Sequence, residues 1–272
     1  MAFRHGDEDL RGAHVPEEEA LRNAMDAERT LDDVASALRR QTRVDFDHHP
    51  IEIALSPEGE LTLAGSVRDL AAKRIAAREA SAIPGVERVL DLLTVPAADV
   101  GDGAIRVTVR DALLTEPALL ECTITERTKG RTEMVRNIVT GRGEIGIEVE
   151  DGTVWLQGVV PGLSHRRLAV GLAWHVPGVR NVVDLLDVSP PEVDHDGEIA
   201  DALLLVIEMV RVVDPAAIDI HVEDATVRLR GWVATPGERD AIERTAWSIE
   251  GVLDVVNELR VAPEVGMRAP GP

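Results

Sequence analysis

The feature that most constrains this chain is an internal repeat. Three stretches, residues 61–95, 154–188 and 227–261, align with one another without gaps. In each, a glycine is followed 20 residues later by a second glycine and 10 residues after that by a valine. The matched positions are Gly65, Gly85 and Val95, then Gly158, Gly178 and Val188, then Gly231, Gly251 and Val261. Such a register is hard to obtain three times by chance, so we predict three copies of one supersecondary unit.

Strand patterns surround the first glycine of every copy. Upstream of it, at residues 51–55, 145–149 and 218–222, apolar residues alternate with others, as in a strand with one buried face. A short polar turn leads to a second alternating stretch that ends at the glycine, which predicts a β-hairpin. Alternation returns after the second glycine and predicts a third strand.

Helix patterns complete each copy. Between the two glycines, apolar residues recur at i, i+4 and i+7. They are Ala76, Ala80 and Ile83, then Ala169, Ala173 and Val176, then Ile242, Ala246 and Ile249. The second glycine is predicted to end this helix as a left-handed C′ residue. A further helical stretch, containing Leu31, Ile105 or Ile199, precedes each hairpin.

This order of elements predicts an α+β fold of three tandem α-β-β-α-β modules, each a three-stranded mixed sheet covered by two helices. A module of about 70 residues buries only about 60% of its unfolded surface, so neighbouring modules should pack together. The predicted divisions are an acidic, partly helical leader at 1–28, modules at 29–97, 102–190 and 197–262, and a disordered tail at 263–272.

The helix between the glycines carries a basic pair in two copies. The pairs are Lys73-Arg74 and Arg166-Arg167, whereas the third copy has only Arg239. A glycine that ends a strand, a basic pair, and then Gly-Val before a closing valine strand resemble the BON domain family over about four fifths of the chain. The resemblance implies the α-β-β-α-β fold and a binding role towards phospholipid membranes, ions or proteins, without catalytic residues.

The second copy departs from the other two by an insertion near residues 122–144. This stretch has three acids and five bases, the one locally basic region of the chain; the bases are Arg127, Lys129, Arg131, Arg136 and Arg142. One interpretation is a solvated loop or an extension of the hairpin. The other is an arm that docks on an acidic partner, including the third module of another copy.

Charge limits the possible partners. The chain has a formal net charge of −20, and residues 191–262 contribute 16 acids against 6 bases. Nucleic acid and anionic lipid repel such a surface unless a basic patch intervenes. Aromatic residues make up 2% of the chain, which leaves few platforms for base stacking. We therefore expect a protein partner or self-association, no nucleic acid, and membrane binding that is possible but disfavoured.

No reaction centre is visible. Residues 45–49 and 194–196 contain Asp and His, but without the spacing of a zinc or calcium site. Neither a nucleophile-base grouping nor a phosphate-cradling glycine loop occurs. We expect no catalytic residues, no metal, no cofactor and no enzyme activity. Cys122 is interpreted as a buried hydrophobe, and Trp174 and Trp247 as core or module packing.

The N-terminal region leaves two interpretations open. Residues 16–41 are predicted to form one long helix with Leu21 and Met25 on a loose apolar stripe, either a frayed leader or an oligomerisation helix. The first residues lack the apolar region of a signal peptide, and no stretch approaches the roughly 18 apolar residues of a membrane span, so we expect a cytoplasmic protein. Its function is predicted as binding or scaffolding; the alternatives are a sensor of a small ion or ligand and a peripheral phospholipid-binding protein.

Membrane binding can be tested directly. Because the net charge is strongly negative, we expect little co-sedimentation with anionic vesicles at 150 mM salt, where screening leaves only short-range attraction. Strong co-sedimentation would contradict this and would direct attention to the five bases of the insertion.

Overall fold

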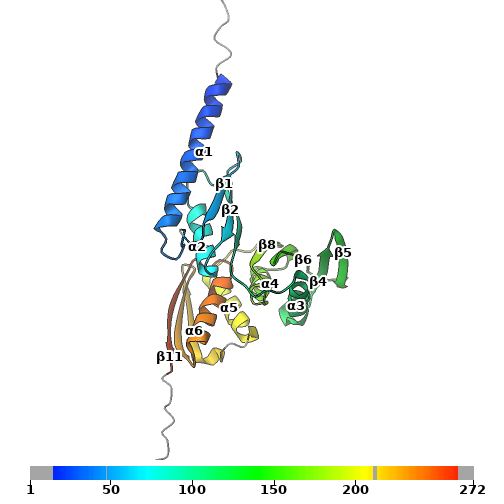
Figure 1. Ribbon diagram of the computed structural model, residues 1–272. Helices are drawn as coiled ribbons and strands as arrows, with labels where there is room; N and C mark the ends of the chain where they lie inside the picture. The colour runs from blue at the N-terminus through cyan, green and yellow to red at the C-terminus, as the bar shows by residue number, and fades with distance from the viewer. Residues whose placement is uncertain (1–14, 47, 211–212, 263–272) are drawn as a thin grey trace, which may run out of the picture.

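The computed structural model describes residues 15–46, 48–210 and 213–262 (Figure 1). The beginning of the predicted leader and the predicted tail at 263–272 lie outside these residues. The first module consists of α1 (Val15–Arg40), β1 (Ile51–Leu55), β2 (Glu60–Ser66), α2 (Leu70–Ser81) and β3 (Arg88–Thr94). β1 pairs antiparallel with β2, and β2 pairs parallel with β3.

The third module repeats this plan. Its elements are α5 (Asp196–Val210), the short 3-10 helix η2 (Pro215–Ala217), β9 (Ile218–Glu223), β10 (Thr226–Val233), α6 (Pro236–Ser248) and β11 (Asp254–Val261). The strand order is again edge strand, central strand, parallel closing strand, here β9-β10-β11. The predicted α+β class and the repeated modules are confirmed.

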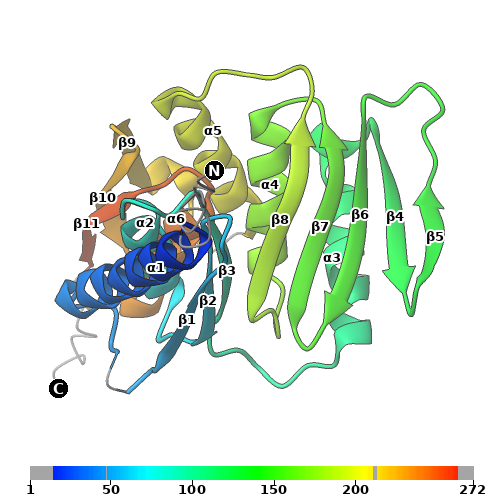
Figure 2. The same cartoon turned by 90° about the horizontal axis from the view of Figure 1, so that it is seen from above.

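The second module has a larger sheet than predicted. Its elements are α3 (Asp102–Thr115), the 3-10 helix η1 (Pro117–Leu119), β4 (Cys122–Thr128), β5 (Arg131–Arg136), β6 (Gly143–Glu150), β7 (Thr153–Val160), α4 (Leu163–Trp174) and β8 (Asn181–Val188). The sheet has five strands in the order β5-β4-β6-β7-β8 (Figure 2). The insertion is thus a hairpin, and β4 pairs parallel with β6 at the edge that is left open in the other modules.

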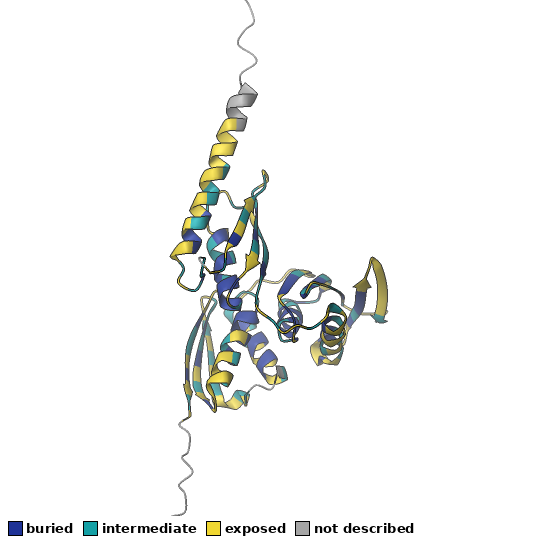
Figure 3. Cartoon of the chain, viewed as in Figure 1, coloured by how far each residue is buried: buried dark blue, intermediate teal, exposed yellow. Residues whose placement is uncertain are grey.

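One hydrophobic core joins the three modules. In every copy, two apolar residues of the central strand point to the helices and are fully buried; they are Leu61 and Leu63, Val154 and Leu156, and Val227 and Leu229. The core continues through α2, α4, α5 and α6, where the buried segments gather in Figure 3. None of the described helices has the length and apolar character needed to cross a membrane.

α1 is one continuous helix that passes the predicted boundary at residue 28. Its C-terminal part packs on the first module, where Val34 and Leu38 are fully buried. Its N-terminal part extends away from the body, and Leu21 and Met25 are 64% and 62% exposed (Figure 1). The predicted stripe is therefore covered over only part of its length.

The position of the second glycine corrects one prediction. The helices end at Ser81, Trp174 and Ser248, three or four residues before the glycine, so Ile83, Val176 and Ile249 lie beyond the helices. In each copy the residue after the glycine donates its N–H to the carbonyl of the residue three positions back, as in Val179 to Val176 at 3.2 Å. The glycine thus occupies the third position of a β-turn, where a type II turn requires positive φ. Gly178 has φ 93°.

The first glycine is required by close backbone approach. A Cβ at Gly158 would lie 2.2 Å from the carbonyl oxygen of Glu144, and one at Gly231 would lie 2.2 Å from that of Ala217. Both carbonyls precede or begin the first strand of the copy's hairpin. No side chain fits between these two backbones, which explains the recurrence of glycine here.

Gly178→Ala should lower the free energy of unfolding by about 1 kcal/mol or more, because φ is positive and the new Cβ would lie 2.6 Å from Val100 Cβ. Chemical denaturation measures the change. Gly103→Ala is the matched control: Gly103 lies in α3 with nothing within 4 Å of the added Cβ, so stability should stay equal or rise slightly. Equal losses in both variants would contradict the assignment.

Candidate functional site

The basic hairpin β4–β5 ends in a tight turn. Thr128 pairs with Arg131 across it, and the two turn residues Lys129 and Gly130 have φ of 49° and 76°. Two positive φ values are the signature of the two-residue turns that match the twist of a hairpin. The turn therefore carries Lys129 at its tip, and the exposed strand β5 begins with Arg131.

The five predicted partner-binding bases do not have the same role in the structure. Arg136 donates to the backbone carbonyls of Cys122, Leu114 and Leu119, so it ties β5 to the end of α3 and to η1. Arg127 lies 3.7 Å from a carboxylate oxygen of Glu148, and Arg142 lies 3.7 Å from one of Glu121. Among the described residues, the side chains of Lys129 and Arg131 form no ion pair or hydrogen bond. Of the five bases, these two are therefore the ones left for a partner.

Two further bases extend this surface. Arg106 and Arg110 on α3 reach the base of the hairpin, where they lie 3.9 and 3.8 Å from a carboxylate oxygen of the buried Glu126. The sequence did not indicate this contact, because α3 and β4 come together only when β4 pairs with β6 in the sheet.

The basic pairs noted in the sequence have divided roles. The first member binds an aspartate of its own module: Lys73 Nζ lies 2.6 Å from Asp91, and Arg166 Nε lies 2.7 Å from Asp184. Arg166 also binds Glu250 of the third module, with Nη2 2.8 Å from Oε1. Burial lowers the pKa of Lys73 to about 8, although Asp91 opposes the shift. In the third copy Asn257 replaces this aspartate and its amide bonds to Glu243 instead.

The second member of each pair reaches the third module. Arg74 Nε donates to the carbonyl of Trp247 at 3.4 Å, and Arg167 Nε donates to that of Glu250 at 2.8 Å. Arg78, one turn after Arg74, donates to the carbonyl of Leu253. Arginines from two modules thus converge on the carboxyl end of α6 and its following turn, where unpaired carbonyls carry partial negative charge.

Residues with metal-ligand character have structural partners instead. Asp194 binds Arg167 at 2.5 Å, and Asp45 accepts from His48 at 2.9 Å. Asp196 accepts from the backbone N–H groups of Asp224 and Ala225, and Asp102 does the same for the β6–β7 turn. The shared pattern Asp-Gly-x-Ile at 102–105 and 196–199 could have revealed this cap. No metal-binding group of His, Cys, Asp or Glu occurs within the described ranges.

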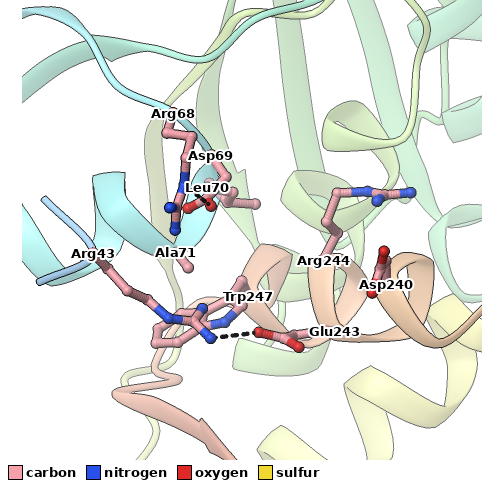
Figure 4. A pocket seen from close by; sticks show the side chains of 9 residues that line it. All are labelled: Arg43, Arg68, Asp69, Leu70, Ala71, Asp240, Glu243, Arg244 and Trp247. Atoms are coloured by element: carbon pink, nitrogen blue, oxygen red, sulfur yellow. Dashed lines mark hydrogen bonds and ion pairs between the residues drawn. The ribbon is translucent and has the colours of Figure 1, made fainter. Parts of the chain in front are cut away.

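A pocket of about 270 Å³ opens where the first and third modules meet (Figure 4). Its charged side chains are three arginines and three carboxylates. Arg43 and Glu243 form an ion pair at 2.9 Å between the modules, and Arg68 binds Asp69. In the part of the chain that the structure describes, Arg244 and Asp240 are left without an ion pair.

The two tryptophans that share one helix position, Trp174 and Trp247, both line pockets between modules. Trp247 is 2% exposed and lines the pocket of Figure 4, whereas Trp174 lines a neighbouring pocket of about 320 Å³. His175 joins α4 to α6, with its ring nitrogens 2.7 Å from the carbonyl of Gly171 and 3.0 Å from Thr245 Oγ1. Burial lowers the pKa of His175. These contacts are part of the packing between modules. Cys122 is fully buried and belongs to the core of its own module.

The model of the BON domain matches three regions, residues 26–97, 123–190 and 195–263. The chain belongs to the BON domain family. Together the matches cover most of the sequence, and the family consists of non-catalytic binding domains. The second BON match begins within β4, after the helix α3.

Two solved structures have a weak similarity to the chain. One is the C-terminal domain of CdsD, a structural protein of the type III secretion system of Chlamydia trachomatis, with 16% identity, a TM-score of 0.24, and coverage of 86% of this chain and 97% of that one. A second CdsD structure has 16% identity, a TM-score of 0.22, and coverage of 89% and 100%. No match was found among curated proteins.

Arg136→Met should lower the free energy of unfolding by about 2 kcal/mol, because three carbonyls lose a charged donor. Arg131→Met, in the same strand but with no side-chain partner, should change stability by less than about 0.5 kcal/mol. Denaturant titration of both variants provides the comparison. A neutral result for Arg136→Met would contradict the anchoring role of these three hydrogen bonds.

Proposed function

We propose that this protein is a non-enzymatic scaffold of three BON modules that binds protein through the tip of the β4–β5 hairpin, with the acidic third module of a second copy as its partner. The observation that carries the proposal is the arrangement in Figure 2, where β5 and the β9-β10-β11 sheet lie at opposite ends of the molecule. A basic tip so placed does not reach the acidic module of its own chain. The complementary charges therefore favour contact between chains.

The hairpin also offers backbone groups to a partner. β5 pairs with β4 on one side and is the outermost strand of its sheet. An exposed edge strand presents unpaired N–H and C=O groups that can accept another strand. Lys129 and Arg131 stand at the start of that edge, so charge attraction and strand pairing would act at one place.

A small-ligand sensor is the second candidate. It is supported by the junction pocket of Figure 4, where Arg244 and Asp240 lack ion-pair partners among the described residues. A ligand seated there would contact two modules at once and stabilise the folded chain by mass action. A thermal-shift screen of small anions, cations and zwitterions separates this candidate from the scaffold, which should respond to almost none of them.

The scaffold predicts association that weakens with salt, because exposed charges are screened beyond about 10 Å at 0.1 M. Light scattering at 50 and 500 mM salt should show oligomers that dissociate at the higher salt. Lys129→Ser/Arg131→Ser should be monomeric already at 50 mM salt. Arg136 is left intact in this test because it holds the hairpin.

Arg22→Ser/Arg29→Ser is the matched control, since it removes the same charge from the exposed part of α1. It should leave association unchanged. Monomers at both salt concentrations would overturn the proposal. A salt-resistant oligomer that is lost in Leu21→Ser/Met25→Ser would assign association to α1 instead.

A further inference from the structure

The turn after α6 carries a carboxylate that the other copies lack. Its sequence is Ile249-Glu250-Gly251, whereas the equivalent turns contain Pro84 and Pro177 before the glycine. Proline is favoured at this second turn position because its φ is already set. Glu250 lacks this preset φ but places a carboxylate side chain at the junction of the modules.

Glu250 shares one guanidinium with a second carboxylate. Arg166 Nη2 lies 2.8 Å from Glu250 Oε1, while Arg166 Nε lies 2.7 Å from Asp184 Oδ2. Asp184 belongs to β8 of the second module, and Glu250 belongs to the third. The other carboxylate oxygen of Glu250 is buried and has no hydrogen-bond partner among the described residues. The site thus holds two acids and one directly bound arginine.

The charged groups around Glu250 come from three elements. Asp184 faces it from β8, Arg166 from α4, and Arg74 from α2. Arg167, also on α4, is engaged by the Glu250 carbonyl and by Asp194. Burial and the charge of Asp184 raise the pKa of Glu250 to about 7, and Arg166 and Arg74 oppose this shift only in part.

We propose that Asp184 and Glu250 share a proton across the junction of the second and third modules, and that loss of this proton loosens the docking of the third module. With the proton present, one acid donates to the other and Arg166 balances the single remaining charge. Without it, two carboxylates on different modules repel each other. The backbone carbonyls that bind Arg74, Arg78 and Arg167 keep their donors, so the third module loosens rather than dissociates.

The direction with pH follows from the raised pKa. A carboxylate that holds its proton more tightly when docked than when undocked stabilises the docked state at low pH. This contribution is complete below about pH 4.5, the ordinary value, declines as the pH rises, and is lost above about pH 7. Two half-buried histidines, His165 and His175, have pKa values lowered by burial and change stability in the opposite direction. The informative quantity is therefore the difference between a variant and the natural chain.

Thermal unfolding of the full chain between pH 5.5 and 8 tests the proposal. Glu250→Gln keeps an acceptor for Arg166 and a donor for Asp184 without a titrating proton. We expect the excess of its melting temperature over that of the natural chain to grow by several degrees between pH 5.5 and pH 8. Asp184→Asn removes the like charge from the other side and should give the same pH-dependent difference.

Glu243→Gln is the control, because Glu243, which lies on α6, also makes an ion pair between modules, with Arg43. The difference in melting temperature between this variant and the natural chain should be the same at both pH values. Hydrogen exchange in the α6–β11 turn, corrected for the intrinsic pH dependence of the rate, should show greater protection at pH 5.5 than at pH 8. The proposal would be overturned if the difference in melting temperature between Glu250→Gln and the natural chain stayed constant from pH 5.5 to pH 8 and the hydrogen-exchange protection of the turn did not change.

Discussion

Hydrogen bonds from arginine to the backbone at the carboxyl end of α6 join the three modules. Arg74 and Arg78 come from the first module and Arg167 from the second, and all end on carbonyls between Trp247 and Leu253. Each module alone has one face of a small sheet and two helices, too little to bury a sizeable core. The arginines fix how α2 and α4 approach α6, and the shared core forms around that contact.

Much of the fold could be predicted because the repeat multiplies weak signals. A single alternating stretch is ambiguous, but three in one register defined hairpins that the structure places within a residue or two of the predicted bounds. The helix ends were predicted less well. The apolar period continued through Ile83 and Val176, because these residues pack on the core from the turn. The pairs Pro84-Gly85 and Pro177-Gly178 were the local signal for that turn.

The site was harder to predict, because its contacts depend on packing between distant segments. The basic pairs were visible in the sequence. That Lys73 binds Asp91 while Arg74 binds the third module depends on which neighbour faces each side of α2. Likewise, the sequence alone does not distinguish the roles of the five bases in the insertion. Their difference arises only once β4 joins β6, which brings Arg136 to the carbonyls of η1 and leaves Lys129 at the tip.

The differences between the copies explain why the first two modules dock on the third. Arg74 and Arg167 occupy the repeat position that is Asp240 in the third copy. The side chain that binds the end of α6 in the first two copies therefore has the opposite charge in the third. The first two copies therefore act as donors and the third as the common acceptor. Asp240 faces the pocket of Figure 4 without an ion pair in the described chain.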